Sequence, residues 1–138
     1  MPRFRTIDHT ADLGIYFYGK TPEEVFIHAG AVLFELMIKA RPGAGEIRKQ
    51  VVLEGSDLGD LLVRWLSELL YFFFVQKQVM TGAEIKSLSD TRLEAEVKLV
   101  PFDPAAHEII NEIKAATYHQ LEFKPGKRGW RARVIFDV

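Results

Sequence analysis

The stretch GWRARVIFDV, residues 129–138, alternates apolar and polar side chains up to the end of the chain. A period of two predicts a β-strand with one buried face. The predicted core face carries Trp130, Ala132, Val134, Phe136 and Val138, and the opposite face carries Arg131, Arg133, Ile135 and Asp137. The strand would therefore place the side chain of Asp137 next to the main-chain carboxylate of Val138.

Further strands are predicted on both sides of a helical region. KPGKRG, residues 124–129, is typical of a hairpin loop, so EIKAATYHQLEF before it would be the partner strand. TRLEAEVKLV, residues 91–100, alternates in the same way. The other predicted strands are residues 3–8, 13–18 and 46–55, and PFDPAAHE, residues 101–108, is expected to form a turn or a short helical piece.

Two amphipathic helices are predicted between these strands. Thr21, Pro22 and Glu24 form the signature of a helix start, and apolar residues recur at helical spacing up to Met37. Ser56 is the expected N-cap of the second helix, whose apolar positions run from residue 58 to residue 73. The whole pattern predicts a single α+β domain over residues 1–138, with two long helices packed on one face of a largely antiparallel sheet.

Composition excludes several classes of protein. The chain has 138 residues, a formal net charge of -1 and no cysteine, which rules out thiolate nucleophiles and sulfur-rich metal sites. The N-terminus lacks the apolar segment of a signal peptide, and LLYFFFV, residues 69–75, is too short to span a bilayer. We therefore expect a cytoplasmic protein without membrane contact. Glycine-rich phosphate loops, a serine nucleophile elbow and HExxH pairs are also missing from the sequence.

Carboxylates gather at two distant places in the sequence. Asp8, His9 and Asp12 lie in DHTAD, residues 8–12, at a predicted connection between strands. Such residues commonly hydrogen-bond their own turn, and Asp137 could simply pair with Arg131 or Arg133 at the surface. Alternatively, the oxygen-rich end of the chain could bind Ca²⁺, Mg²⁺ or Mn²⁺, and participation of His9 would favour Zn²⁺. The residues by themselves leave these alternatives open.

Four separated motifs, in this order, resemble the archease family: IDHTADLGI, LSELLYFF, EIKAATYHQLEF and WRARVIFDV. The resemblance implies an accessory protein, not an enzyme, that acts with the GTP-dependent RNA-splicing ligase. That ligase joins RNA ends carrying a 3′-phosphate or cyclic phosphate, and archeases promote its guanylylation and multiple turnover. RNA would then be contacted only indirectly. The alternative that the family suggests is a chaperone-like specificity factor for a tRNA methyltransferase.

The resemblance also implies a metal site. Its ligands would be Asp12, Asp137 and the carboxylate of Val138, and the divalent metal ion would be Ca²⁺ in the first place, with Mg²⁺, Mn²⁺ or Zn²⁺ as alternatives. Further metal or partner contacts are expected from His9, Lys114, Tyr118, His119, Arg131 and Arg133. One departure from the family pattern is the sequence FFFVQKQ, residues 72–78, which lacks the acidic residue that members often carry there. A metal-dependent hydrolase working alone is disfavoured, because no general base or nucleophile accompanies the carboxylates.

Overall fold

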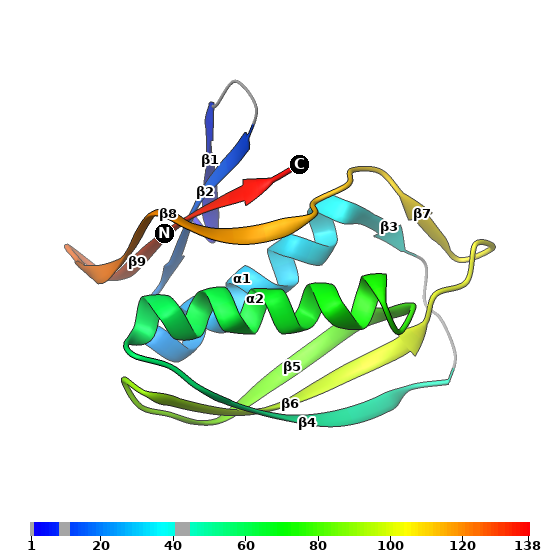
Figure 1. Ribbon diagram of the computed structural model, residues 1–138, viewed down its shortest axis with the longest axis horizontal. Helices are drawn as coiled ribbons and strands as arrows, with labels where there is room; N and C mark the ends of the chain where they lie inside the picture. Colours follow the sequence, from blue (N-terminus) through cyan, green and yellow to red (C-terminus); the bar gives the residue numbers. More distant parts are fainter. Residues whose placement is uncertain (1, 9–11, 41–44) are drawn as a thin grey trace.

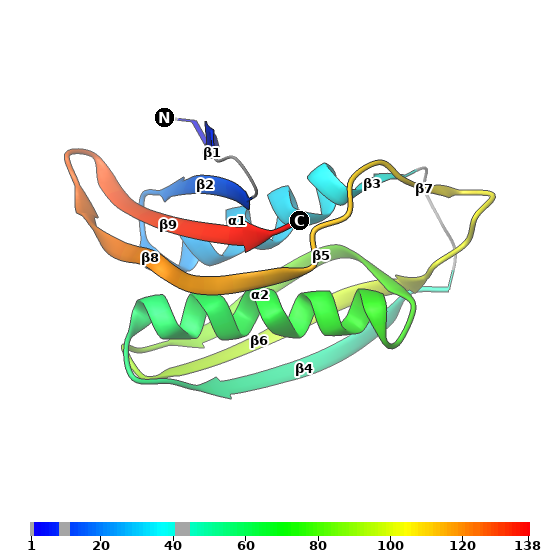
Figure 2. The same ribbon diagram turned by 45° about the horizontal axis from the view of Figure 1, so that its top comes forward.

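The computed structural model describes residues 2–8, 12–40 and 45–138, in which two helices lie between a four-stranded and a three-stranded sheet (Figures 1 and 2). The elements are β1 (Phe4–Asp8), β2 (Asp12–Gly19), α1 (Pro22–Met37), β3 (Ile38–Ala40), β4 (Ile47–Glu54), α2 (Leu58–Phe74), β5 (Gln78–Leu88), β6 (Arg92–Pro101), β7 (His107–Ile109), β8 (Ala115–Gly126) and β9 (Gly129–Asp137). The α+β class with two long helices and antiparallel strands is confirmed.

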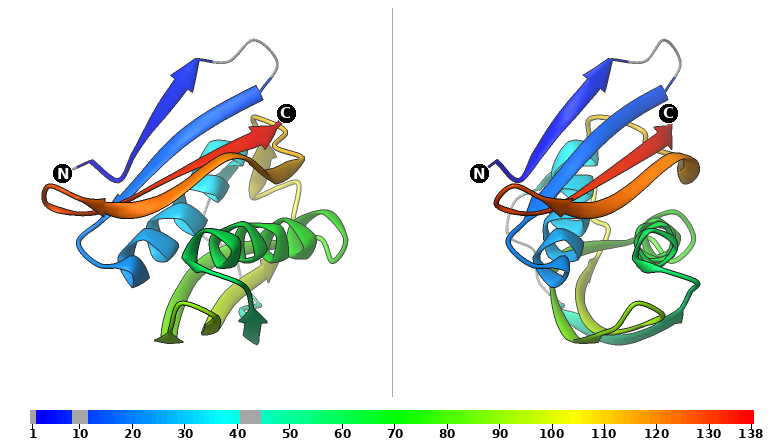
Figure 3. Two further views of the ribbon diagram at one scale, coloured as in Figure 1. Left: turned by 60° about the vertical axis from the view of Figure 1, so that its left-hand side comes forward. Right: turned by 90° about the vertical axis from the view of Figure 1, so that its left-hand side faces the viewer.

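The strands form three sheets rather than the one that the sequence analysis expected. Their orders are β1-β2-β9-β8, β4-β6-β5 and β3-β7. Both views of Figure 3 show α1 and α2 in the middle layer, with the four-stranded sheet on one side and the three-stranded sheet on the other. The helices are therefore covered on two sides, which explains why their apolar surfaces are so wide.

Strand β9 lies inside the four-stranded sheet and pairs with β2 and β8. Ala132, Val134 and Phe136 are fully buried, as the period of two predicts. Val138, predicted on the same core face, is 50% exposed because the strand ends at Asp137, and Ile135 on the opposite face is buried. Phe136 packs edge-to-face against Phe17 of β2, with the ring centroids 6.3 Å apart. Because both neighbours are antiparallel, residues directly opposite each other along these ladders share a face of the sheet.

The helix starts follow from side chains that cap backbone N–H groups. Thr21 accepts a hydrogen bond from the Glu24 N–H at 3.2 Å, which confirms the predicted N-cap of α1. The N-cap of α2 is Asp57, not Ser56 as predicted, because Asp57 accepts from the Asp60 N–H at 2.8 Å. None of the helices in the described part of the chain is long and apolar enough to cross a membrane.

Strand β5 was not predicted from the sequence. Its pairing with β6 shifts register between Met80 and Gly82 and again between Ile85 and Ser87. Each irregularity changes which face a side chain occupies, so the apolar residues lose their regular alternation. The short strands β3 and β7, three residues each, carry too little sequence to show a period.

A bulge in β8 connects the four-stranded sheet to α2. Thr117 stands opposite Ile135 and Glu122 opposite Arg133, so residues 118–121 have Val134 alone across from them. The extra residues carry Tyr118 out of the ladder, and its hydroxyl donates a hydrogen bond to Asp60 Oδ1 at 2.6 Å. The segment containing Tyr118 therefore has a structural role, because it links the four-stranded sheet to α2 through a hydrogen bond.

Asp60 accepts several further hydrogen bonds. The N–H of Ser56 donates to Asp60 Oδ2 at 2.9 Å, and Arg64 Nε lies 3.1 Å from the same oxygen. The bonds from Tyr118 and Ser56 lower the pKa of Asp60 from its ordinary value of 3.8 to about 2, although burial acts in the opposite direction. The folded state thus holds this carboxylate in its ionised form.

We expect Asp60 to contribute to the pH dependence of stability. Its folded pKa lies below its unfolded pKa, so the contribution is present above about pH 4 and is lost as the pH falls towards about 2. The free energy of unfolding is measured by urea denaturation at several pH values in this range. It should fall more steeply with decreasing pH in the parent protein than in Asp60→Asn. Asp90→Asn, an exposed control, should follow the parent. Equal slopes for the parent and Asp60→Asn would contradict the role of Asp60.

Gly129, at the turn between β8 and β9, should not tolerate a side chain. Its φ is +147°, and a Cβ atom there would lie 2.4 Å from the carbonyl oxygen of Gly19. Gly129→Ala is expected to lower the free energy of unfolding by about 1–3 kcal/mol. Gly126→Ala in the same hairpin is the control, because its Cβ would have ordinary contacts. Chemical denaturation of both variants checks this, and equal losses would refute it.

Candidate functional site

The two sequence segments that carry the predicted metal ligands are neighbours in the four-stranded sheet. Asp12, the first residue of β2, stands directly opposite Asp137, the last residue of β9. Side chains at directly opposite positions of an antiparallel pair lie on the same face, with Cβ atoms about 4.5–5.5 Å apart. The β2–β9 ladder therefore brings together two carboxylates that are more than a hundred positions apart in the sequence.

The main chain around Asp137 is held on its other side by β8. The N–H of Lys114 donates to the carbonyl oxygen of Asp137 at 2.8 Å, and Ala115 pairs with Asp137 in the ladder. Val138 follows immediately and is 50% exposed. Its carboxylate is thus one residue away from a strand that is fixed on both edges.

The β2–β9 register places the like charges of Asp12 and Asp137 directly opposite each other. No Lys or Arg of the described segments forms an ion pair with either of them. Another like-charged pair, Glu84 opposite Glu96, has Lys86 3.4 Å from Glu84 and Arg48 3.4 Å from Glu96. Like charges directly opposite each other are unfavourable in a sheet. A cation between Asp12 and Asp137 would remove this repulsion.

The oxygen atoms of Asp12, Asp137 and the Val138 carboxylate suit a hard divalent cation. They are too few to occupy all of its coordination positions. Carboxylate oxygens are the ligands that Ca²⁺, Mg²⁺ and Mn²⁺ prefer. Within residues 2–8, 12–40 and 45–138, no three His, Asp or Glu side chains are grouped so as to hold a metal ion. His9 lies outside the described residues, so its part in a zinc site stays a prediction. Two side chains and the Val138 carboxylate would leave positions for water or for groups of a partner.

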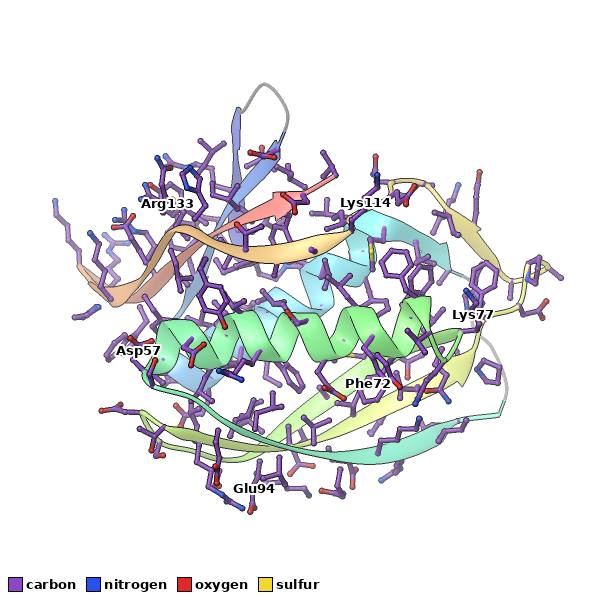
Figure 4. The ribbon with its side chains drawn as sticks, viewed as in Figure 1. Asp57, Phe72, Lys77, Glu94, Lys114 and Arg133 are labelled. Carbon is purple, nitrogen blue, oxygen red and sulfur yellow. The ribbon has the colours of Figure 1, made fainter. Side chains whose placement is uncertain are left out.

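The structure separates the residues of the segment from Lys114 to His119. Lys114 is exposed and lies beside the candidate site, one residue before β8 begins (Figure 4). Tyr118 is directed to Asp60 of α2, and His119 is exposed within the bulge. Of these predicted contacts, Lys114 is the one that the fold brings next to Asp137.

Arg131 and Arg133 share the Asp137 face of β9 but have other ionic partners. Arg133 lies 3.0 Å from Glu122 of β8, and Arg131 lies 3.8 Å from the same carboxylate. The pairing of Asp137 with these arginines, which the sequence left open, is thus not the arrangement found. Glu122, and also Tyr16, which contacts both arginines, were not predicted from the sequence. The alternation of residues 13–18 puts Tyr16 on the face opposite the core. This pattern could have identified Tyr16 as a residue of the same surface as the arginines.

Comparison with known proteins gives the same family along the whole chain. Residues 4–138 match the Archease protein family (MTH1598/TM1083). Protein archease of Methanosarcina mazei is 36% identical over 140 residues, which cover 99% of this chain and 96% of that protein. Protein archease of Pyrococcus furiosus is 32% identical over 142 residues and is covered completely, as is this chain.

Solved structures agree with the fold. The solution structure of Methanobacterium thermoautotrophicum protein 1598 has a TM-score of 0.71 and 32% identity, with full coverage of both chains. The crystal structure of a Thermotoga maritima protein, described as "an archease, possible chaperone", has a TM-score of 0.65 and 24% identity over 97% of this chain and 96% of that one. This second likeness concerns the fold alone. From the family match and these relatives, the chain belongs to the archease family.

Proposed function

We propose that the protein is an activator of the GTP-dependent 3′-phosphate RNA ligase, in tRNA splicing or RNA repair, and that it binds a divalent metal ion through Asp12, Asp137 and the Val138 carboxylate. Membership of the archease family supports an accessory role. The observation that carries the metal site is the pair of facing carboxylates without a cationic partner among the described residues. Ca²⁺ is the first choice, and Mg²⁺, Mn²⁺ or Zn²⁺ are the alternatives.

The position of the site suits action on a partner protein. The carboxylates lie at the end of the sheet, and Asp137 and Val138 are exposed. Strand pairing on both edges of β9 fixes the direction of the Asp137 side chain before any metal arrives. When bound, a divalent cation would neutralise phosphate charge of the kind that develops in nucleotidyl transfer. The residues of this chain would hold one side of that cation and leave the other side accessible.

The alternative function is a specificity factor for a tRNA methyltransferase. Exposed large apolar side chains favour some protein contact, since Val75, Ile109 and Ile110 are each about half exposed or more. This alternative would produce a direct complex with the methyltransferase and no change in the rate of ligase guanylylation.

Removal of either carboxylate should abolish activation without unfolding the protein. Asp12→Asn and Asp137→Asn keep the side-chain shape, so both variants should fold, and their like-charge repulsion is relieved. The measurements are guanylylation and multiple-turnover ligation by the cognate ligase, with and without the protein. Calorimetric titration of the isolated protein with Ca²⁺ gives a second readout, in which both variants should lose binding.

Glu84→Gln is the matched control, because it removes one carboxylate from the Glu84–Glu96 pair of the other sheet. This variant should bind Ca²⁺ and activate the ligase as the parent does. Full activation by Asp12→Asn and Asp137→Asn would show that the metal site is wrongly assigned. Loss of Ca²⁺ binding with unchanged activation would separate the metal site from the ligase.

Extension of the chain beyond Val138 should also weaken the site. One added glycine moves the terminal carboxylate to a new residue and replaces a charged donor by a peptide carbonyl. We expect the affinity for Ca²⁺ to fall by about tenfold or more, as is common when a supporting group of a metal site is removed. The same glycine added at the N-terminus is the control. Unchanged affinity in the extended protein would remove the Val138 carboxylate from the ligand set.

A further inference from the structure

The outer face of the four-stranded sheet carries a second group of functional side chains, beyond the carboxylates. The ladder aligns Arg5, Tyr16, Arg133 and Glu122 in one row across β1, β2, β9 and β8. The next row contains Tyr18, Arg131 and Lys124. Directly opposite residues share a face, and positions two apart along a strand share it too. We call these residues the arginine face.

Tyr16 organises the arginine face. The guanidinium carbons of Arg5 and Arg131 each lie 4.7 Å from the centre of the Tyr16 ring, and that of Arg133 lies 6.0 Å away. Arg133 also donates a hydrogen bond to the Tyr16 hydroxyl at 3.4 Å. Cation–π contacts hold a guanidinium in place but use few of its N–H groups. Three cations from two strands are thus held around one ring. The nitrogens of Arg133 already contact Gln120, Tyr16 and Glu122, so the donors offered to a ligand come mainly from Arg5 and Arg131.

The arginine face has an excess of positive charge, although the whole chain has a formal charge of -1. Lys124, Arg133 and Arg131 all pair with one carboxylate, Glu122, at 2.8, 3.0 and 3.8 Å. The hydrogen bond from Lys124, and then the charges of these cations, lower the pKa of Glu122. The single negative charge of Glu122 does not neutralise the three positive charges around it, and Arg5 adds a fourth positive charge to this face.

The face continues into a hollow at the β8–β9 hairpin. The hollow is lined by aromatic and basic side chains, namely Tyr18, Lys124, Lys127, Arg128, Trp130 and Arg131. Lys127 and Arg128 form the exposed tip of the hairpin. Figure 4 shows Arg133 on the side of β8 and β9 that is turned away from α2, among several other nitrogen-bearing side chains. The positive surface therefore extends from β1 to the tip of the hairpin.

We infer that the arginine face and the hairpin hollow bind single-stranded RNA directly. The guanidinium fork matches a phosphate group, and aromatic rings beside cations provide stacking for unpaired bases. An acidic peptide would use the charges but would have no need of the aromatic ring of Tyr18, which lies opposite Arg131. Single-strand binding rests on this surface alone, whereas the choice of RNA over DNA rests on the proposed function. The inference replaces the expectation of indirect RNA contact.

The face also relates RNA to the candidate metal site. Asp137 follows Arg133 by four positions on the same face of β9, which is about 13 Å along a strand. The row with Ile135 and Thr117 lies between them. Ile135 in that row is buried, so RNA held by the arginines would lie near the carboxylate end of the sheet but would be separated from it by a covered row of side chains.

Fluorescence anisotropy of the protein alone with a labelled single-stranded RNA of about twelve nucleotides tests the inference. Binding should be measurable at about 50 mM salt and should weaken strongly at about 200 mM. The double variant Arg131→Gln/Arg133→Gln should bind RNA about tenfold or more weakly than the parent. Its slope of log affinity against log salt should fall by about 0.7 for each phosphate group that the variant no longer neutralises.

Arg48→Gln/Lys49→Gln is the matched control, since it removes the same charge from β4 of the other sheet. It should bind RNA as the parent does, and circular dichroism should show all variants folded. Tyr18→Leu should weaken binding with an unchanged salt slope, because it removes stacking and no charge. Asp12→Asn should still bind RNA, so a failure of the metal-site proposal is distinguishable from a failure here.

Three results would overturn the inference. The first is no binding of RNA at low salt. The second is equal weakening in the β4 control, which would mean a general charge effect. The third is a poly-glutamate peptide that competes fully while Tyr18→Leu has no effect, which would identify the surface as one for acidic proteins. A DNA strand of the same length that binds as tightly as RNA would remove the preference for RNA.

Discussion

The antiparallel pairing of β2 with β9 is the constraint on which the rest of the molecule depends. It joins the two ends of the chain, closes the four-stranded sheet over α1 and α2, and places Phe136 against Phe17 in the core. The same register puts Asp12 opposite Asp137 and Tyr16 opposite Arg133. A shift of one residue would send the carboxylates and arginines to the core face. Core packing therefore fixes the positions of the residues in both proposed sites.

Much of the fold follows from periodicity in the sequence. The alternation in residues 129–138 and 91–100, and the caps before two helical runs, predict the α+β class and the faces of β9 and β6. Of the second sheet, β4 and β6 were predicted, but β5 could not be, because its register shifts break the alternation of its side chains. Local patterns also do not say which strands pair, and the three-sheet arrangement is a matter of long-range pairing.

The candidate metal site required information beyond local pattern. Asp12 and Asp137 each have an ordinary explanation as a turn residue or a surface acid, and only the β2–β9 register makes them neighbours. Tyr118 is the opposite example. The sequence predicted it as a partner contact, but the bulge in β8 directs its side chain to Asp60 of the same chain. The arginine face depends on Arg5, Tyr16 and Arg131, which come from three strands and form no motif in the sequence.

The internal position of β9 also has a consequence for the biogenesis of the protein. Synthesis from the N-terminus produces β9 after all other elements, yet this strand belongs between β2 and β8. Until it arrives, both neighbours have an unpaired edge, which is the kind of surface that recruits strands from other chains. Contacts across such a long sequence separation also form slowly. The nascent chain is thus most exposed to aggregation just before β9 pairs and completes the four-stranded sheet.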